Sequence, residues 1–250
     1  MKKSAFLVLS FFCFFFGFAQ SPQYVGHRGS YLGVENTYAA FVNGAQKYPY
    51  IECDIRVTAD SAIVISHDLT TNRVGGNLEV AKAALAQLKA ENYVQKRYGV
   101  TYVGRISTLE EYLAVCDTFS VTPVIELKWS TGINNDDCSL IPLLVKELEK
   151  CSFRNRCVIL TSMKKCLEYI QDNYPDIKLQ FLGGEKWKNS IDWILSHKID
   201  VDLIHTAVTA DDVKMLHDAG LKVNTWTVDD PARAEELTSM GVDMITTNKL

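Results

Sequence analysis

The sequence has no surplus of positive charge. Its 250 residues include 26 Lys and Arg against 30 Asp and Glu, which gives a formal net charge of −4, and no block of like charge occurs. A nucleic-acid-binding surface needs clustered basic side chains to neutralise phosphates. The composition therefore argues against nucleic acid as a partner.

The sequence also lacks Cys-x-x-Cys pairs and the Cys/His spacing of zinc sites. After residue 20 it contains Cys53, Cys116, Cys138, Cys151, Cys157 and Cys166. Cys53 and Cys116 lie in apolar segments and are expected to be buried. The other four are close in sequence, and an oxidising compartment would permit disulfides among them, with the pairing left open.

Only one long apolar run is present, at residues 5–18, after Lys2-Lys3 and followed by Ala19. A short basic start, an apolar run and small residues predict a signal peptide at 1–19. The run is short for a membrane span, and an uncleaved anchor is the alternative. We therefore expect residues 20–250 to form one exported domain, periplasmic or secreted, without membrane insertion.

Strand-like and helix-like segments alternate along the rest of the chain. The eight expected strands begin near Gln23, Tyr50, Pro123, Cys157, Leu179, Val201, Lys222 and Met244. Eight β-runs separated by helical patterns predict an α/β protein, a closed TIM (β/α)8 barrel, with Ala62–Ser66 as a side strand. The last strand is followed almost at once by Leu250, so the last helix is expected to be missing or reduced.

An insertion at about residues 69–107 interrupts the alternation of strands and helices after the second strand. The stretch contains Gly75-Gly76, a helical pattern at Val80–Lys89 and a mixed segment at Tyr93–Tyr102. A long irregular insertion in a compact domain is typical of a lid or substrate loop.

Some helix ends carry recognisable signals. Asp230 before Pro231 predicts an N-cap followed by a proline in the first helical turn. Gly220 and Gly241 follow helical patterns, at positions that favour positive φ.

Three carboxylates are expected at the carboxyl ends of two strands. Glu52 and Asp54 are two residues apart, so period two places both on one face of a strand, and Glu126 with Lys128 repeats this spacing. Buried like charges are costly unless a cation compensates them. Three oxygen ligands suit Mg²⁺ or Ca²⁺, whereas structural ion pairing with Lys128 or an arginine is the alternative.

Two histidines lie at neighbouring strand ends. His27 and Arg28 follow the first strand, and His67 follows Ala62–Ser66. Histidine both donates and accepts protons near neutral pH, and arginine offers a planar fork for phosphate. His205 also ends a strand and is a weaker candidate. Trp226, near the end of a late strand, suits equally a packed barrel residue and an apolar wall for a substrate.

These residues together resemble a known family. The motifs are HRG at 27–29, ENT at 35–37, ExD at 52–54, HD at 67–68, IELK at 125–128 and NTWTVD at 224–229. Their order and spacing over the whole mature chain resemble the glycerophosphodiester phosphodiesterase family. Two departures concern Ser61, where the family often has glycine, and the last five residues, which lack the family's usual proline.

The resemblance implies a TIM barrel with a small insertion after the second strand, and metal-dependent hydrolysis of glycerophosphodiesters, a small-molecule substrate class, to glycerol 3-phosphate and an alcohol. By position it implies His27 and His67 as acid and base, and Glu52, Asp54 and Glu126 as ligands of one divalent cation. It implies Arg28 and Lys128 as phosphate contacts and Glu35 and Asn36 as supporting residues, and Trp226 is the candidate for a further substrate contact.

The sequence leaves open two other kinds of enzyme and one binding protein without enzymatic activity. A related phospholipase-type or inositol phosphodiesterase would use the same barrel. A glycosidase would use two of the carboxylates as its acid pair, although the histidines and Arg28 argue against it. A third alternative is a periplasmic protein that binds phosphate-bearing ligands without turnover. Such a protein would have no use for the acid–base pair His27 and His67, which argues against it.

Overall fold

The computed structural model describes residues 21–128 and 138–250. The predicted signal peptide, 1–19, lies outside these residues, as does Trp129 at the end of one predicted strand. Among the residues described, no helix combines the length and the apolar character that crossing a membrane would require.

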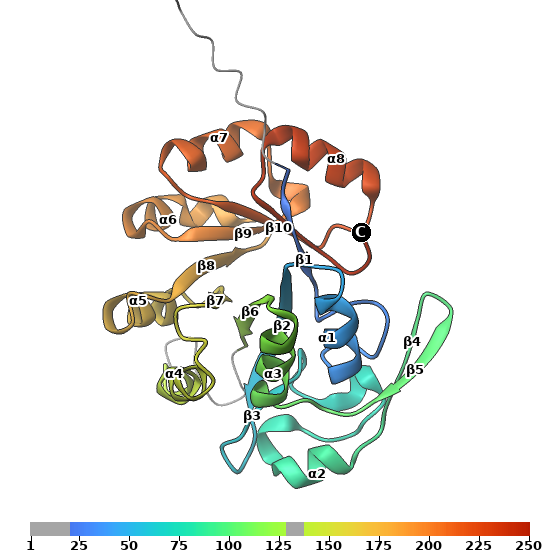
Figure 1. Cartoon of the computed structure of the whole chain (residues 1–250). Coiled ribbons are helices and arrows are strands. Elements are labelled where there is room, and N and C mark those ends of the chain that lie inside the picture. The colour runs from blue at the N-terminus through green and yellow to red at the C-terminus, as the bar shows by residue number, and fades with distance from the viewer. Residues whose placement is uncertain (1–20, 129–137) are drawn as a thin grey trace, which may run out of the picture.

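Eight parallel strands form a closed barrel (Figure 1). They are β1 (Gln23–Gly26), β2 (Tyr50–Val57), β6 (Thr122–Leu127), β7 (Val158–Thr161), β8 (Lys178–Gly183), β9 (Asp200–Ile204), β10 (Val223–Trp226) and β11 (Met244–Thr247). Each strand pairs with the next, and β1 pairs with both β11 and β2. The predicted TIM barrel is confirmed.

Helices cover the outside of the barrel (Figure 1). They are α1 (Tyr38–Ala45), α3 (Leu109–Phe119), α4 (Leu140–Lys150), α5 (Lys164–Asn173), α6 (Ile191–His197), α7 (Ala210–Asp218) and α8 (Pro231–Met240). Residues 248–250 follow β11 without a helix, as expected. The barrel still closes there, because β1 and β11 pair from Gln23 with Met244 to Gly26 with Thr247.

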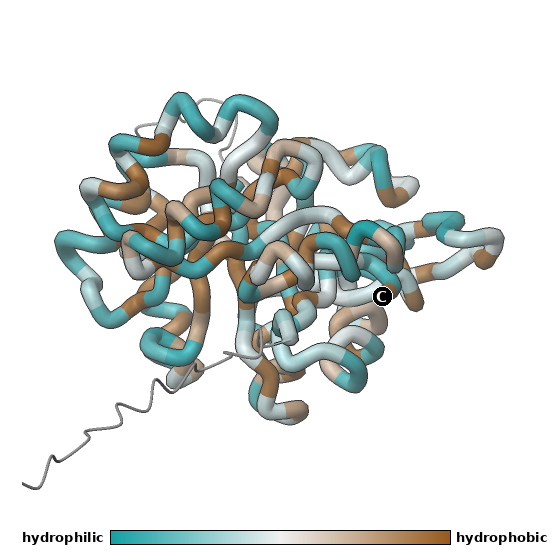
Figure 2. Tube along the Cα trace, turned by 90° about the horizontal axis from the view of Figure 1, so that it is seen from above, coloured by the Kyte–Doolittle hydropathy of each residue, from teal (hydrophilic) through white to brown (hydrophobic). Residues whose placement is uncertain are grey.

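Alternation along the strands separates two apolar regions. Side chains on one face, such as Ile125 and Val201, pack against the helices, while Val25, Val124 and Leu160 on the other face fill the barrel. In Figure 2 the brown segments occur mostly toward the centre of the molecule and the teal ones along its outer turns. This is the period-two pattern of a sheet buried on both faces.

The insertion after β2 is more ordered than the sequence indicated. The side strand β3 (Ile63–Ile65) pairs antiparallel with β2, as predicted. The predicted helix at Val80–Lys89 is wrong in extent, since a 3₁₀ turn, η2 (Val80–Lys82), precedes the short helix α2 (Leu85–Ala90). A second 3₁₀ turn, η1 (Thr71–Val74), lies upstream.

The segment expected to be irregular is a hairpin. Strands β4 (Tyr93–Arg97) and β5 (Val100–Gly104) pair antiparallel and project from the barrel in Figure 1. Tyr98 and Gly99 make the two-residue turn with φ of 48° and 85°. Positive φ at both positions is typical of the turn whose twist matches a hairpin, and tyrosine there concealed the turn from sequence reasoning.

The predicted helix ends are confirmed. Asp230 accepts a hydrogen bond from the backbone N–H of Ala232, and Gly220 and Gly241 have φ of 80° and 88°. No disulfide occurs among the cysteines in the described part of the chain. The sulfur atoms of Cys138 and Cys166 nevertheless lie 3.6 Å apart.

Candidate active site

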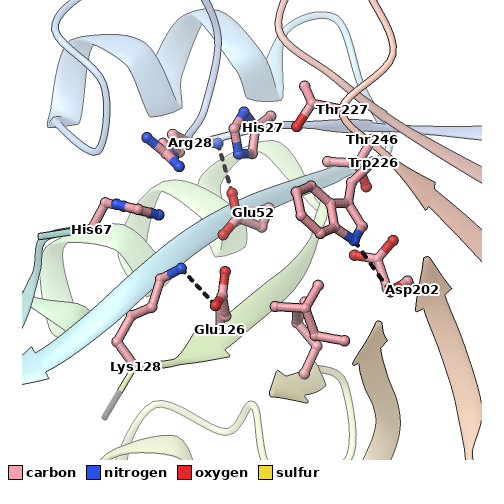
Figure 3. Close-up of a pocket in the computed structure, with 12 residues that line it drawn as sticks. His27, Arg28, Glu52, His67, Glu126, Lys128, Asp202, Trp226, Thr227 and Thr246 are labelled. Atoms are coloured by element: carbon pink, nitrogen blue, oxygen red, sulfur yellow. Dashed lines mark hydrogen bonds and ion pairs between the residues drawn. The ribbon is translucent and has the colours of Figure 1, made fainter. Parts of the chain in front are cut away.

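A cavity of about 130 Å³ lies where the carboxyl ends of the barrel strands meet. Catalytic groups of TIM barrels gather at this end, because the strand ends and the loops that follow them converge there. The predicted site residues that line it are His27, Arg28, Glu52, His67, Glu126, Lys128 and Trp226 (Figure 3). The structure thus brings together residues on or directly after β1, β2, β6 and β10 of the barrel and from the end of the side strand β3. Asp54, Glu35 and Asn36 do not line the cavity but lie in direct contact with Arg28 or with one another.

A tight turn after β1 presents His27 and Arg28. The backbone N–H of Gly29 donates to the carbonyl of Gly26, and Arg28 and Gly29 both have positive φ, at 51° and 87°. A Cβ at Gly29 would lie 2.6 Å from the backbone of Ala40. Glycine is therefore required for the close approach between this turn and α1.

Arg28 connects the turn to the carboxylates of β2. Its backbone N–H donates to Glu52 Oε2 at 2.8 Å, and its guanidinium contacts Glu35 at 2.7 Å and Asp54 at 3.3 Å. Asn36 Nδ2 donates to Asp54 Oδ2 at 2.7 Å. The supporting pair Glu35 and Asn36 therefore holds the arginine and the aspartate in place.

The three carboxylates meet as their spacing predicted. One oxygen from each of Glu52, Asp54 and Glu126 lies within 4.8 Å of the others. Strands β2 and β6 are in register here, with Asp54 opposite Glu126. Oxygen ligands on opposite sides of Mg²⁺ or Ca²⁺ are about 4–5 Å apart. In addition, Glu52 Oε1 is buried without a hydrogen-bond partner, so the donor set fits a hard divalent cation.

The carboxylates differ in charge preference. Burial and the charge of Asp54 raise the pKa of Glu52 well above its usual value, and they raise the pKa of Glu126 to about 7. Burial acts in the same direction on Asp54, but Lys128 and Arg28 outweigh it and lower the pKa of Asp54. Buried like charges without a cation favour protonation, and a divalent cation would relieve this repulsion.

Lys128 lies against the same cluster. Its Nζ is 2.6 Å from Glu126 Oε1 and 3.1 Å from Asp54 Oδ1. The ion pairing anticipated as the alternative to a metal is therefore present at one edge of the cluster. Glu52 has no lysine partner there, and its unpartnered oxygen faces the cavity with Glu126 (Figure 3).

His27 is oriented by the end of the chain. Its Nδ1 lies 3.0 Å from Asn248 Oδ1, which also accepts from Arg97 Nη2 at 3.2 Å. The Asn248 amide N–H donates to Asp229 at 2.8 Å, so Oδ1 is the acceptor and His27 Nδ1 carries the proton. Burial and Arg28 lower the pKa of His27 to about 4. The His27 ring is therefore neutral, and its Nε2 atom is free to accept a proton.

His67 has a charged partner instead. Its Nδ1 lies 2.7 Å from Asp68 Oδ1, and Arg73 Nε donates to Asp68 Oδ2 at 2.8 Å. Burial lowers the pKa of His67 below its usual value, and the nearby Asp54 and the hydrogen bond to Asp68 only partly offset this effect. A carboxylate in direct contact stabilises an imidazolium, so His67 is better suited than His27 to carry a proton. Figure 3 shows the two rings on opposite sides of Arg28.

Of the two weaker candidates from the sequence, Trp226 lines the cavity and His205 does not. The indole of Trp226 borders the cavity, where its Nε1 donates to the backbone carbonyl of Asp202 at 3.3 Å. His205 lies in the 3₁₀ turn η4 (His205–Ala207) after β9 and is not part of the cavity lining. The tryptophan thus supplies an apolar wall.

Sequence reasoning missed several residues of the site. Asn248 and Arg97 belong to segments far from the motifs, and no local pattern marks them. Leu160 and Leu182 also line the cavity, but in the sequence they resemble ordinary core residues of strands. Asp202 also lines the cavity, and a signal for it existed, since Asp200-Val201-Asp202 repeats the acid-x-acid spacing of Glu52 and Asp54.

Comparison with known proteins gives a family match across the barrel. The model of the family described as "Glycerophosphoryl diester phosphodiesterase family" matches residues 26–250. A glycerophosphodiester phosphodiesterase of Caldanaerobacter subterraneus subsp. tengcongensis is 27% identical over 235 residues, which covers 90% of this chain and 93% of the relative. One of Bacillus subtilis (strain 168) is 26% identical over 244 residues, covering 90% and 82%.

Solved structures share the architecture. An Oleispira antarctica phosphodiesterase, whose structure holds the product sn-glycerol-3-phosphate, superposes with a TM-score of 0.77 at 21% identity and covers 91% of this chain and 93% of its own. At 21% identity, this structural similarity supports a shared fold.

Proposed function

Because the chain belongs to the glycerophosphoryl diester phosphodiesterase family, whose members are hydrolytic enzymes, we propose that it cleaves glycerophosphodiesters into glycerol 3-phosphate and an alcohol. The observation that carries this proposal is the carboxylate cluster. Three oxygens of Glu52, Asp54 and Glu126 lie within 4.8 Å, one glutamate oxygen has no partner, and two histidines border the same cavity.

Glu52, Asp54 and Glu126 would hold one divalent cation, Mg²⁺ or Ca²⁺. When bound, such an ion supplies positive charge for the phosphate and lowers the pKa of a nearby hydroxyl. Arg28 and Lys128, which border the cavity, add fixed positive charge for the phosphate oxygens. Trp226 would pack against the carbon chain of the substrate.

The hydrogen bonds of the two histidines support distinct roles. His27 is held neutral, with its proton on Nδ1 and a neutral amide as partner, so it is the general base that removes a proton from the attacking hydroxyl. His67 contacts the carboxylate of Asp68, so it is the general acid that protonates the departing alkoxide. This pairing balances the proton gained against the proton given up.

The deciding experiment measures hydrolysis of glycerophosphocholine and glycerophosphoethanolamine by residues 20–250, before and after EDTA. We expect chelation to abolish activity and either Mg²⁺ or Ca²⁺ to restore it. The control variant is Asp60→Asn, which removes a carboxylate outside the cavity and should leave the metal requirement unchanged. Full activity in EDTA would contradict the metal site, and turnover of neither substrate would contradict the reaction.

We also propose that residues 1–19 direct export of the protein, from the basic start and apolar run of that segment. Expression of the full chain with and without residues 1–19, followed by N-terminal sequencing of the exported product, tests this. A mature protein that begins at Gln20 is the expected result.

A further inference from the structure

Asp202 is a buried carboxyl group that the proposed mechanism does not use. Asp202 lies on β9 and is only 3% exposed, and its Oδ1 atom has no hydrogen-bond partner. No ion pair involving it occurs among residues 21–128 and 138–250. A buried polar atom without a partner destabilises the fold, so its presence in a ligand cavity calls for an explanation.

The surroundings of Asp202 are those of a substrate pocket. Leu160, Leu182 and the indole of Trp226 border the cavity beside it. Figure 3 shows Asp202 below Trp226, on the side of the cavity away from His67 and Lys128. Thr227 and Thr246 line the cavity above Trp226 in Figure 3, and Asp202 is the carboxyl group beside the apolar side chains. A few polar groups among apolar side chains are the arrangement by which pockets orient small ligands.

The two sides of the cavity suggest how a substrate would lie. The cations of Arg28 and Lys128 are on the side of the carboxylate cluster, which suits the phosphate. The carbon chain would then extend along the apolar wall toward Asp202. The unpartnered Oδ1 of Asp202 can accept a hydrogen bond from a hydroxyl there.

We propose that Asp202 is a specificity-determining residue that binds the glycerol hydroxyl farthest from the phosphate. The inference rests on the proposed function, because it names how that site would recognise the glycerol part of its substrate. A polyol phosphate would be preferred over an analogue that lacks this hydroxyl, since the analogue leaves the buried carboxyl without a partner.

The test compares two ligands and three variants by calorimetry in the presence of Mg²⁺. The ligands are glycerol 3-phosphate and propane-1,2-diol 1-phosphate, which lacks the terminal hydroxyl. We expect the wild-type protein to bind glycerol 3-phosphate roughly tenfold more tightly than the analogue. Asp202→Leu should abolish this preference, and Asp202→Asn should keep most of it, because an amide still donates and accepts.

The matched control is Asp200→Asn on the same strand. The Asp200 carboxylate accepts from the backbone N–H of Lys222 at 2.8 Å and does not line the cavity, so the ligand preference should not change. Thermal unfolding adds a second readout. Asp202→Leu should raise the midpoint of unfolding, because it removes an unpartnered buried polar group.

Several results would overturn the assignment. They are an unchanged preference in Asp202→Leu, an equal loss of affinity for both ligands, binding of neither ligand by the wild-type protein, and a lower unfolding midpoint, which would mark Asp202 as structural. A wild-type protein that shows the preference but does not hydrolyse glycerophosphodiesters would support the Asp202 site and contradict the proposed reaction alone.

Discussion

At the scale of single residues, several titratable groups of the site have an identifiable neighbour that favours one protonation state. Asn248 fixes the proton of His27 on Nδ1, and Asp68 favours a charged His67. Asp54 is kept ionised by Lys128, and in turn its charge makes Glu126 hard to ionise. Groups whose environments push their pKa values apart are typical of acid–base sites.

The two histidines can be distinguished by the leaving group. His27→Ala and His67→Ala should each lower kcat on glycerophosphoethanolamine by about 10²–10⁴. A p-nitrophenyl phosphodiester of glycerol needs no proton on its leaving group, so His67→Ala should recover most of its activity with it, whereas His27→Ala should not. Equal losses in both variants on both substrates would contradict the assigned roles.

Metal affinity should depend on pH through Glu126. Its pKa of about 7 means that the free site is increasingly protonated below that pH, and a cation must then displace the proton. The apparent affinity for Mg²⁺ should therefore fall as the pH decreases, by roughly tenfold per unit for one proton. Calorimetric titrations between pH 5.5 and 8 measure this, and Glu126→Gln should bind weakly with a flatter profile. An affinity independent of pH would count against Glu126 as a ligand.

At the scale of secondary structure, two adjacent strands carry the carboxylates and one helix joins them. The hydroxyl of Tyr112 on α3 donates to the carbonyl of Ile51 on β2 at 2.6 Å and accepts from the N–H of Val124 on β6 at 3.2 Å. Tyr112 is fully buried. The register that places Asp54 opposite Glu126 is thus supported from outside the barrel.

Removing this hydroxyl tests the support. Tyr112→Phe should lower the free energy of unfolding by about 1–3 kcal/mol, because two buried backbone groups lose a partner. The affinity for Mg²⁺ should also fall, since the ligands sit on the two strands that the hydroxyl joins. Tyr38→Phe, at an exposed tyrosine, is the control for chemical denaturation. No change in either quantity would show that the strands hold their register without Tyr112.

At the scale of the whole molecule, three distant segments meet behind His27. Arg97 on the β4–β5 hairpin donates to the carbonyl of Ser30 at 2.7 Å and to Asn248 at 3.2 Å. The hairpin also reaches Glu35 through Gln95. The insertion therefore contributes to the site by bracing the turn after β1 and the residues after β11.

Disrupting this brace should affect turnover more than folding. Arg97→Ala should lower kcat by roughly ten- to a hundredfold, because a poorly held Asn248 leaves His27 misoriented. Its neighbour Lys96 is exposed, and Lys96→Ala should behave as the wild-type protein. A rise in KM with unchanged kcat would indicate that the hairpin binds substrate rather than orients the histidine.

Much of the fold and part of the site were determined by the sequence alone. The period-two spacing of Glu52 and Asp54 assigned both to one face of a strand, and β2 begins at Tyr50, where a strand was predicted. The alternation of strand and helix patterns was sufficient for the barrel, because the pattern of apolar residues within one element specifies its type and its buried face. The candidate residues followed because they lie at strand ends, which a barrel gathers at one rim.

Only the tertiary structure decided how these groups are partnered. The contact between His27 and Asn248 joins residues 221 positions apart, and it exists because β1 pairs with β11 when the barrel closes. The Tyr98-Gly99 hairpin and the position of Asp202 beside Leu160, Leu182 and Trp226 likewise depend on packing between distant segments. Local sequence carries the identity of each element, whereas hydrogen bonds, burial and protonation depend on which elements the closed barrel brings together.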